Sequence, residues 1–174
     1  MANDPVAWRA LMPDLPKLDR IDINILVQLQ NDGALTNVHL SERIGLSPSP
    51  CLQRVKRLER AGYITGYGAT INLAKLIDSV TIFTEVTLVD HRIDDFAKFE
   101  ANVRDIDELM ECHLVSGGYD YLLRFLARNI AHYQEQMEGL LRRNIGIEKY
   151  FSYIVIKSPI VKHAVPLRAL LEAS

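Results

Sequence analysis

Residues 37–62 read NVHLSERIGLSPSPCLQRVKRLERAG, and this stretch decides the first half of the fold. Thr36 is a suitable N-cap for a first helix, and Gly45 is a suitable left-handed residue just after its end. Ser47 is then expected to cap a second helix with its side-chain oxygen, and Pro48 takes the first helical position, where a missing N–H is no loss. The spacing therefore predicts two short helices joined by a tight turn.

Apolar residues recur at helical spacing in both predicted helices. Val38, Leu40 and Ile44 are expected to face inward from the first helix. Leu52, Val55 and Leu58 are expected to do so from the second. The second helix then turns a small, polar N-terminal half and a cationic C-terminal half outward.

A helix of about 14 residues, roughly 21 Å long, fits the major groove of DNA with its first turns at the base edges. The alternative for the basic run alone is a solvated charged face, but the tight turn between two amphipathic helices favours DNA binding. The residues predicted to contact DNA are Ser47, Pro48, Ser49, Gln53, Arg54, Lys56, Arg57 and Arg60. Of these, Ser47, Ser49, Gln53 and Arg54 are expected at base edges and the other three cations at phosphates.

A further helix is predicted over residues 18–32, LDRIDINILVQLQND. Asp19 is its expected N-cap, with Asp22 three residues later in a capping box, and Gly33 is expected to end it. Together with the helix pair it completes a small three-helix module. The β-prone residues 63–67, YITGY, are expected to form a wing or a linker strand.

Composition narrows the class of protein. The 174-residue chain has a net charge of −2, which argues against indiscriminate binding of polyanions. The chain has no run of 18 apolar residues and no basic-then-apolar leader, so a cytoplasmic protein is expected, without a membrane partner. Two cysteines, Cys51 and Cys112, do not suffice for a zinc site and are expected to be reduced.

From Val80 on, the pattern changes to strand, helix, strand, strand, helix, strand. The strands are predicted over residues 81–89, 109–116, 121–127 and 149–157, and the helices over 94–104 and 130–143. This order is ferredoxin-like. The whole chain is therefore expected to be α+β, with an N-terminal three-helix, winged-helix-like helix-turn-helix domain and a C-terminal ferredoxin-like βαββαβ sandwich.

The predicted strands are apolar on both sides, as in YLLRFLA and YFSYIVI. Two helices cover only one face of a sheet, with expected inward residues Phe96, Phe99, Val103, Tyr133, Met137, Leu140 and Leu141. The other face needs a partner, and a second copy of the chain is the simplest one. A two-fold dimer also presents two recognition helices to half-sites roughly 34 Å apart.

Three segments, LDRIDINIL, LSPSPCLQRVKRLERAGYITGY and ECHLVSGGYDYLLR, closely resemble the leucine-responsive regulator (Lrp/AsnC) family of prokaryotic transcription regulators. The resemblance covers residues 18 to about 167. It implies a helix-turn-helix domain, a linker strand and an amino-acid-sensing domain that forms dimers and often tetramers or octamers. It also implies an effector bound between dimers near a glycine-containing turn, whose positions here are Gly117, Gly118, Tyr119, Asp120 and Tyr121.

The chemistry of this turn suits a zwitterion. Consecutive glycines expose backbone N–H groups to a carboxylate, and Asp120 suits an ammonium group. The alternative is a tight hairpin in which Asp120 only satisfies the turn backbone. The family commonly has Asp where this chain has Gly118, which leaves the identity of the effector open.

Four parts are expected along the chain: a leader over residues 1–17, a helix-turn-helix DNA-binding domain over 18–65, a linker strand over 66–79, and a ligand-binding and oligomerisation domain (RAM/ACT-like) over 80–174. The expected partners are double-stranded DNA, further copies of the chain and a small amino-acid effector. No cofactor, metal or catalytic residue is expected, because the five histidines are scattered and no paired carboxylates or nucleophilic triad occur. An architectural, nucleoid-type DNA-wrapping protein without an effector remains the alternative function.

Overall fold

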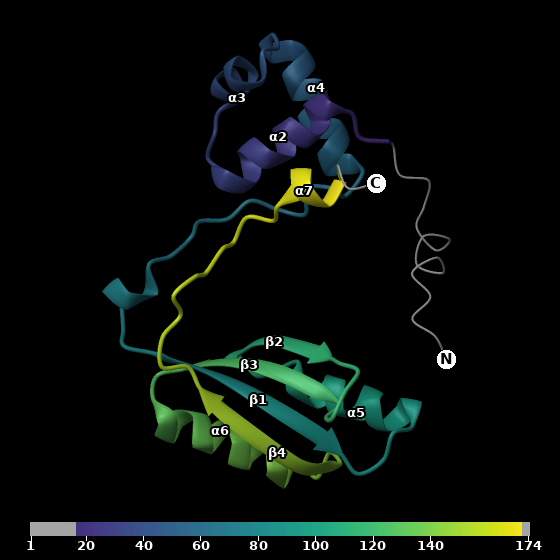
Figure 1. Cartoon of the computed structure of the whole chain (residues 1–174), viewed down its shortest axis with the longest axis vertical. Coiled ribbons are helices and arrows are strands. Elements are labelled where there is room, and N and C mark those ends of the chain that lie inside the picture. The colour runs from purple at the N-terminus through teal and green to yellow at the C-terminus, as the bar shows by residue number, and fades with distance from the viewer. Residues whose placement is uncertain (1–16, 172–174) are drawn as a thin grey trace. The chain divides into compact units, whose positions relative to one another are not determined.

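The computed structural model describes residues 17–171 of the chain, so the expected leader lies outside the described residues except for Lys17. The chain folds as two compact units. Among the described residues, unit 1 comprises 17–70 and 161–171, and unit 2 comprises Ile71–Ile160. Figure 1 shows the helices of unit 1 and the sheet of unit 2.

Unit 1 is built on three helices, α2 (Arg20–Asn31), α3 (Asn37–Ile44) and α4 (Pro48–Arg60). Asp19 and Asp22 form the predicted capping box at the start of α2. The Thr36 side chain accepts the His39 N–H at 3.3 Å at the start of α3. Gly45 ends α3 with a φ of 70°, the left-handed conformation that glycine adopts without strain. The predicted helix-turn-helix is therefore confirmed.

Several local expectations for unit 1 are wrong. The Ser47 side chain makes no capping hydrogen bond, and the Asn37 amide instead joins the two helices by donating to the Pro48 carbonyl at 2.8 Å. Val38 of α3 and Leu52 of α4 are exposed, and the buried residues of α4 are Cys51 and Leu58. The core consists of Ile25, Leu40, Cys51 and Leu58, with the half-buried Val55 and Ile44 among the residues packed around it.

Residues 66–79 do not form the expected strand. They contain a short 3-10 helix, η1 (Leu73–Lys75), and the preceding Tyr63 and Ile64 pack on the core of unit 1. No wing strand forms over residues 63–67 either. The Tyr67 hydroxyl donates to Glu59 of α4 at 2.8 Å, and this hydrogen bond holds the segment against the C-terminal part of α4.

The C-terminal segment belongs to unit 1 and not to the ligand-binding domain in which the sequence placed it. The Gln30 amide makes two hydrogen bonds to the Val165 backbone, at 2.9 and 3.0 Å. Arg168, in α7 (Leu167–Leu171), donates to Asn24 of α2 at 3.0 Å. The chain therefore leaves unit 1 before the sheet and returns to it afterwards.

Unit 2 is the predicted ferredoxin-like sandwich. Its strands are β1 (Val80–Leu88), β2 (Leu109–Leu114), β3 (Tyr121–Ala127) and β4 (Ile147–Ile154), in an antiparallel sheet of order β2-β3-β1-β4. Helices α5 (Ile93–Val103) and α6 (Ile130–Arg142) pack against it (Figure 1). The predicted effector turn, residues 117–121, therefore lies between the edge strand β2 and strand β3.

The core of unit 2 lies between the helices and one face of the sheet. Phe99, Val103, Tyr133, Met137 and Leu140 are its helical members, as predicted, and they meet the alternate residues of β1 and β3. Leu141, which was expected to be buried, is exposed, and Phe96 is partly buried.

Candidate DNA-binding and effector sites

The outward face of α4 carries most of the residues predicted to contact DNA. Ser47, Pro48, Ser49, Gln53, Lys56 and Arg60 are all exposed. The Ser49 and Gln53 side chains lie four residues apart and so share one face of the helix. The Arg60 side chain bends back to the Lys56 carbonyl, with a distance of 3.1 Å, so the two cations lie on adjacent turns.

The two other predicted DNA contacts, Arg54 and Arg57, are held within unit 1. Asp22 of α2 has no solvent exposure and accepts a hydrogen bond from Arg54 at 2.8 Å. Its second oxygen accepts a hydrogen bond from Arg57. Arg54 also pairs with Asp19 at 2.7 Å. Any contact between these two guanidinium groups and DNA therefore competes with ion pairs inside the domain.

The electrostatics of this cluster favour its charged form. The backbone N–H of Asp22 and the Arg54 guanidinium hold the pKa of the Asp19 carboxyl below its usual range. The hydrogen bonds from Arg54 to Asp19 and Asp22 raise the pKa of the Arg54 guanidinium. Sequence reasoning assigned Asp22 only to the capping box and missed its link to α4, because the pairing crosses 32 residues of chain.

In unit 2, the predicted effector turn lies between β2 and β3. Gly117 and Gly118 are exposed, and Tyr119 and Asp120 are half-buried. One Asp120 oxygen accepts the Leu88 backbone N–H at 2.7 Å, and the carboxylate also pairs with His91 at 3.0 Å. Asp120 therefore bonds to the end of β1 and not to the backbone of its own turn, and its contact with His91 lies near the surface.

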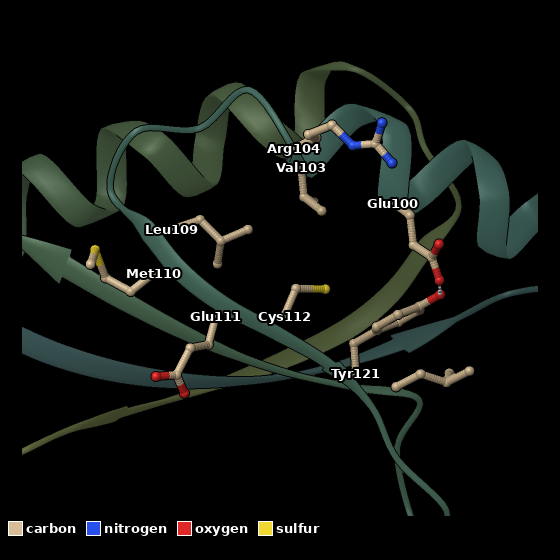
Figure 2. A pocket seen from close by; sticks show the side chains of 9 residues that line it. Glu100, Val103, Arg104, Leu109, Met110, Glu111, Cys112 and Tyr121 are labelled. Atoms are coloured by element: carbon tan, nitrogen blue, oxygen red, sulfur yellow. Dashed lines mark hydrogen bonds between the residues drawn. The ribbon is translucent and has the colours of Figure 1, made fainter. Parts of the chain in front are cut away.

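Tyr121 extends from this turn into the sandwich. Its side chain is 1% exposed, stacks beside Phe99 at 4.5 Å between ring centroids, and donates to Glu100 of α5 at 2.8 Å. Burial, together with the Glu100 carboxylate, raises the pKa of the Tyr121 hydroxyl. The hydroxyl lies at the edge of a groove between α5 and β2 (Figure 2), which no sequence pattern had indicated.

The face of the sheet opposite the helices carries no helix of unit 2, and it is called the open face below. The strand register places alternate residues there: Phe83, Glu85, Glu111, His113, Leu122, Arg124, Leu126, Phe151 and Tyr153. Phe151 and Tyr153 are 57% and 51% exposed. An ion pair from Glu111 to Arg124, at 2.6 Å, and a hydrogen bond between Glu111 and His113, at 3.2 Å, lie on the same face.

Within residues 17–171, no helix has the length and apolar character needed to cross a membrane. Nor do three or more His, Cys, Asp or Glu side chains in this range gather as metal ligands would.

The fold and these surfaces define a DNA-binding protein with a separate ligand-binding domain. Models of known protein families match both parts of the chain. Residues 18–65 match the winged helix-turn-helix DNA-binding model, and residues 81–165 match the Lrp/AsnC ligand binding domain.

The chain is similar in sequence over most of its length to two named regulators. It is 46% identical over 142 residues, 82% of its length and 90% of the relative's, to the transcriptional regulatory protein DoeX of Halomonas elongata. It is 46% identical over 140 residues, 80% of its length and 85% of the relative's, to the leucine-responsive regulatory protein of Escherichia coli K12.

The fold is also similar to that of a solved structure. A transcriptional regulator from Neisseria meningitidis, crystallised as a complex with L-Met, has a TM-score of 0.82 and 35% identity. The match covers 89% of this chain and 100% of that one. The chain belongs to the Lrp/AsnC family: it is a DNA-binding transcription regulator with a ligand-binding domain, and not an enzyme.

Proposed function

We propose that the protein is a sequence-specific regulator that binds operator DNA as a homo-oligomer and whose binding is modulated by a small amino acid. The observation that carries the proposal is the exposed polar and cationic face of α4 at the turn of a helix-turn-helix. Since α4 is 13 residues long, one copy reaches only a few base pairs. A second copy is needed for a site of useful length.

The exposed side chains divide by chemistry. Ser47, Ser49 and Gln53 carry hydroxyl and amide groups at the N-terminal half of α4, which suit base edges. Lys56 and Arg60 carry charge alone and suit phosphates. The Pro48 ring is exposed beside Ser47 and Ser49. Arg54 and Arg57 remain in the proposed interface, but their first role is to hold α4 against α2.

The open face of the sheet supports dimerisation. Large apolar side chains such as Phe151 and Tyr153 remain exposed there when the chain stands alone. Exposed apolar patches of this kind mark protein interfaces. The pairing of like faces around a two-fold axis buries the same residues from both copies, and the resulting dimer carries two recognition helices.

The effector is assigned to the turn Gly117, Gly118, Tyr119, Asp120 and Tyr121, between dimers. Two exposed glycines leave backbone N–H groups available to a carboxylate, and the Asp120 carboxylate lies near the surface beside His91. The relative crystallised with L-Met supports an amino acid as the kind of ligand. An effector shifts DNA binding only to the extent that it binds the two assembly states with different affinity.

The experiment is footprinting of the full chain on the upstream region of its own gene, with and without each of the common amino acids. Protection of a defined site that changes with one class of amino acid supports the proposal. Uniform, sequence-independent protection that no amino acid alters would support the architectural alternative instead. Calorimetry against the same amino acids then shows whether any of them binds in the absence of DNA.

A further inference from the structure

The C-terminal segment of unit 1, residues 161–171, packs beside α2 although it follows the whole of unit 2 in the chain, and it is called the strap below. Figure 1 shows its helix α7, in yellow, next to α2. The Gln30 side chain donates to the Val165 carbonyl at 2.9 Å and accepts the Val165 N–H at 3.0 Å. Arg168 donates to Asn24 at 3.0 Å. The strap therefore binds α2 at two of its residues.

These contacts are few, and they leave the strap only partly buried. Val165 and Leu171 are 49% and 45% exposed. A groove of about 420 Å³ remains between the strap, α2 and residues 63–66, with apolar side chains such as Leu29 and Leu167 on its walls. Segments with exposed hydrogen bonds and few buried apolar contacts open at a low cost in free energy. The strap therefore has an accessible undocked state beside the docked state of the structure.

Helix α2 also holds the recognition helix. Its Asp22 binds Arg54 at 2.8 Å and also binds Arg57, both on α4. Asp19, the N-cap of α2, pairs with Arg54 at 2.7 Å. A continuous helix of 12 residues carries a displacement from one of its contacts to another. A docked strap thus restrains α2, and α2 in turn restrains α4.

The strap is in addition the direct continuation of unit 2. Strand β4 ends at Ile154, and the Val155 N–H still donates to the Thr81 carbonyl of β1 at 2.9 Å. Residues 156–164 then lead to Val165 without a helix or a strand. The chain from Val155 to Val165 spans at most roughly 35 Å. A displacement of the end of β4 that exceeds the slack of this connection therefore pulls on the strap.

We propose that the strap couples the two units: docked on α2, it holds the recognition helix in the arrangement that binds operator DNA, and its release weakens that binding. A change in unit 2 that displaces the end of β4 favours release. The inference rests on the proposed function, to which it adds the route by which unit 2 acts on α4. By linkage, bound operator DNA and the docked strap favour each other.

Two variants loosen the strap from opposite sides of the contact. Gln30→Ala removes both hydrogen bonds to Val165, and Leu167→Asp places a charge at a half-buried position on the wall of the apolar groove. Each has a matched control. Asn31→Ala removes an exposed amide of α2 that bonds within α2 itself. Leu170→Asp places the same charge at a position of α7 that is 61% exposed.

Fluorescence anisotropy of the full chain, with the footprinted site and with a random duplex, measures the effect on DNA binding. Gln30→Ala and Leu167→Asp are expected to weaken binding to the site about threefold to tenfold, the effect of one or two lost hydrogen bonds. Affinity for random DNA should stay unchanged, because the cations Lys56 and Arg60 remain exposed. An amino acid that alters site binding by the wild type should alter it less in these variants, since the strap is already released. Both controls should behave as the wild type.

Hydrogen exchange of residues 161–171 in the full chain reports on the strap itself. Because the Val165 N–H is bonded to Gln30, exchange of this segment should be faster in Gln30→Ala and Leu167→Asp. It should be slower in the wild type when operator DNA is bound. Unchanged exchange in both variants, or on addition of operator DNA, would contradict the proposal. A melting temperature within a few degrees of wild type shows that each variant remains folded.

The outcomes separate this inference from the proposed function. Faster exchange of the strap with wild-type affinity for the site in both variants overturns the inference, since the strap then only packs on α2, while the proposed function stands. Equal loss of affinity for the site and for random DNA also overturns it. If no amino acid alters site binding by the wild type, the proposed modulation fails, whereas weaker site binding by both variants still supports the coupling of the strap to α4.

Discussion

The buried carboxylate of Asp22 on α2 accepts a hydrogen bond from Arg54 of the recognition helix at 2.8 Å. The Arg54 side chain is 28% exposed and the Asp22 side chain is not exposed at all. Since Arg57 binds the other Asp22 oxygen, two residues of α4 are held by one residue of α2. The orientation of α4 within unit 1 therefore depends on a buried residue of α2.

Asp22→Asn should weaken operator binding more than non-specific binding. The variant loses a buried charge that two guanidinium groups require, which costs about 1–3 kcal/mol of domain stability. Operator affinity falls because α4 is held less firmly, whereas the two freed cations preserve attraction to any DNA. Fluorescence anisotropy with operator and random duplexes measures both affinities. Glu42→Gln, with the same charge change at an exposed position, is the control. Equal weakening on both duplexes would show that Asp22 does not position the helix.

Gln53→Ala and Lys56→Ala should separate base contacts from phosphate contacts. Loss of the Gln53 amide is expected to reduce operator affinity by about 1–3 kcal/mol while leaving random DNA unaffected. Loss of Lys56 should weaken binding to both and reduce the slope of log K against log salt by about 0.9. Titrations at several salt concentrations measure this slope. A salt slope that changes in Gln53→Ala and not in Lys56→Ala would reverse the two assignments.

Arg54→Ala should weaken operator binding by about 1–3 kcal/mol if Arg54 contacts a base edge. The ion pairs of Arg54 with Asp19 and Asp22 predict in addition a loss of stability in unit 1. Hydrogen exchange of the α2 and α4 amides in the full chain measures this loss. Weaker operator binding with unchanged exchange would make Arg54 a DNA contact and not a support for α4.

The capping box should make α2 sensitive to acid. The folded pKa of Asp19 lies below its ordinary value of 3.8, so its contribution to stability is present above that value and is lost as the pH falls through the folded pKa. Asp19→Ala removes about 1 kcal/mol, the usual value of an N-cap. Hydrogen exchange at pH 7 should therefore be faster in the variant, and the difference from wild type should shrink below pH 3.8. A difference that stays constant down to pH 2 would contradict this account.

Asp120→Ala should abolish the response to amino acids and also destabilise unit 2. The Leu88 N–H loses its acceptor in a buried part of β1, which costs about 1–3 kcal/mol. His91→Ala removes the exposed contact of the imidazole with Asp120 but leaves the Leu88 N–H bonded to Asp120, so it serves as the control. Thermal unfolding and calorimetry of both variants separate the two roles. A stable Asp120→Ala protein that still responds to amino acids would exclude the residue from the effector site.

Measurement of the molecular mass in solution tests whether the open face is the dimer interface. Phe151→Asp places a charge among apolar residues of that face and should convert an oligomer to a monomer with poor operator affinity. Ile156→Asp is the control, because Ile156 is 98% exposed and lies beyond the end of β4. Light scattering coupled to size exclusion gives the mass. A Phe151→Asp protein with the wild-type mass would place the interface elsewhere.

The parts of the fold that depend on short-range pattern were predictable. Alternation in β3 and helical spacing in α5 and α6 placed these elements within one or two residues, and the caps Asp19, Thr36 and Gly45 were each identified from local chemistry. The expected linker strand was wrong, because propensity in YITGY does not supply a partner strand. The return of Val165 to Gln30 crosses 135 residues and left no local signal.

In the candidate sites, too, some features follow from local sequence pattern and others depend on tertiary packing. The outward face of α4 follows from helical periodicity alone, whereas the ion pairs of Arg54 and Arg57 depend on how α2 and α4 pack. The groove beside Tyr121 combines residues of α5, β2 and β3, and these elements come together only in the folded sandwich. Helical pattern predicted the exposed polar face of α4, whereas the burial of Cys51 in place of Leu52 and the ion pairs of Arg54 depend on packing.

The most direct test of the account is the affinity of the full chain for the footprinted upstream site, measured beside a random duplex across a range of amino-acid concentrations. A sequence-specific regulator should bind the site roughly 10³-fold or more tightly than random DNA at physiological salt, and an apolar amino acid should shift that ratio. Equal affinity for both duplexes at every amino-acid concentration would contradict it.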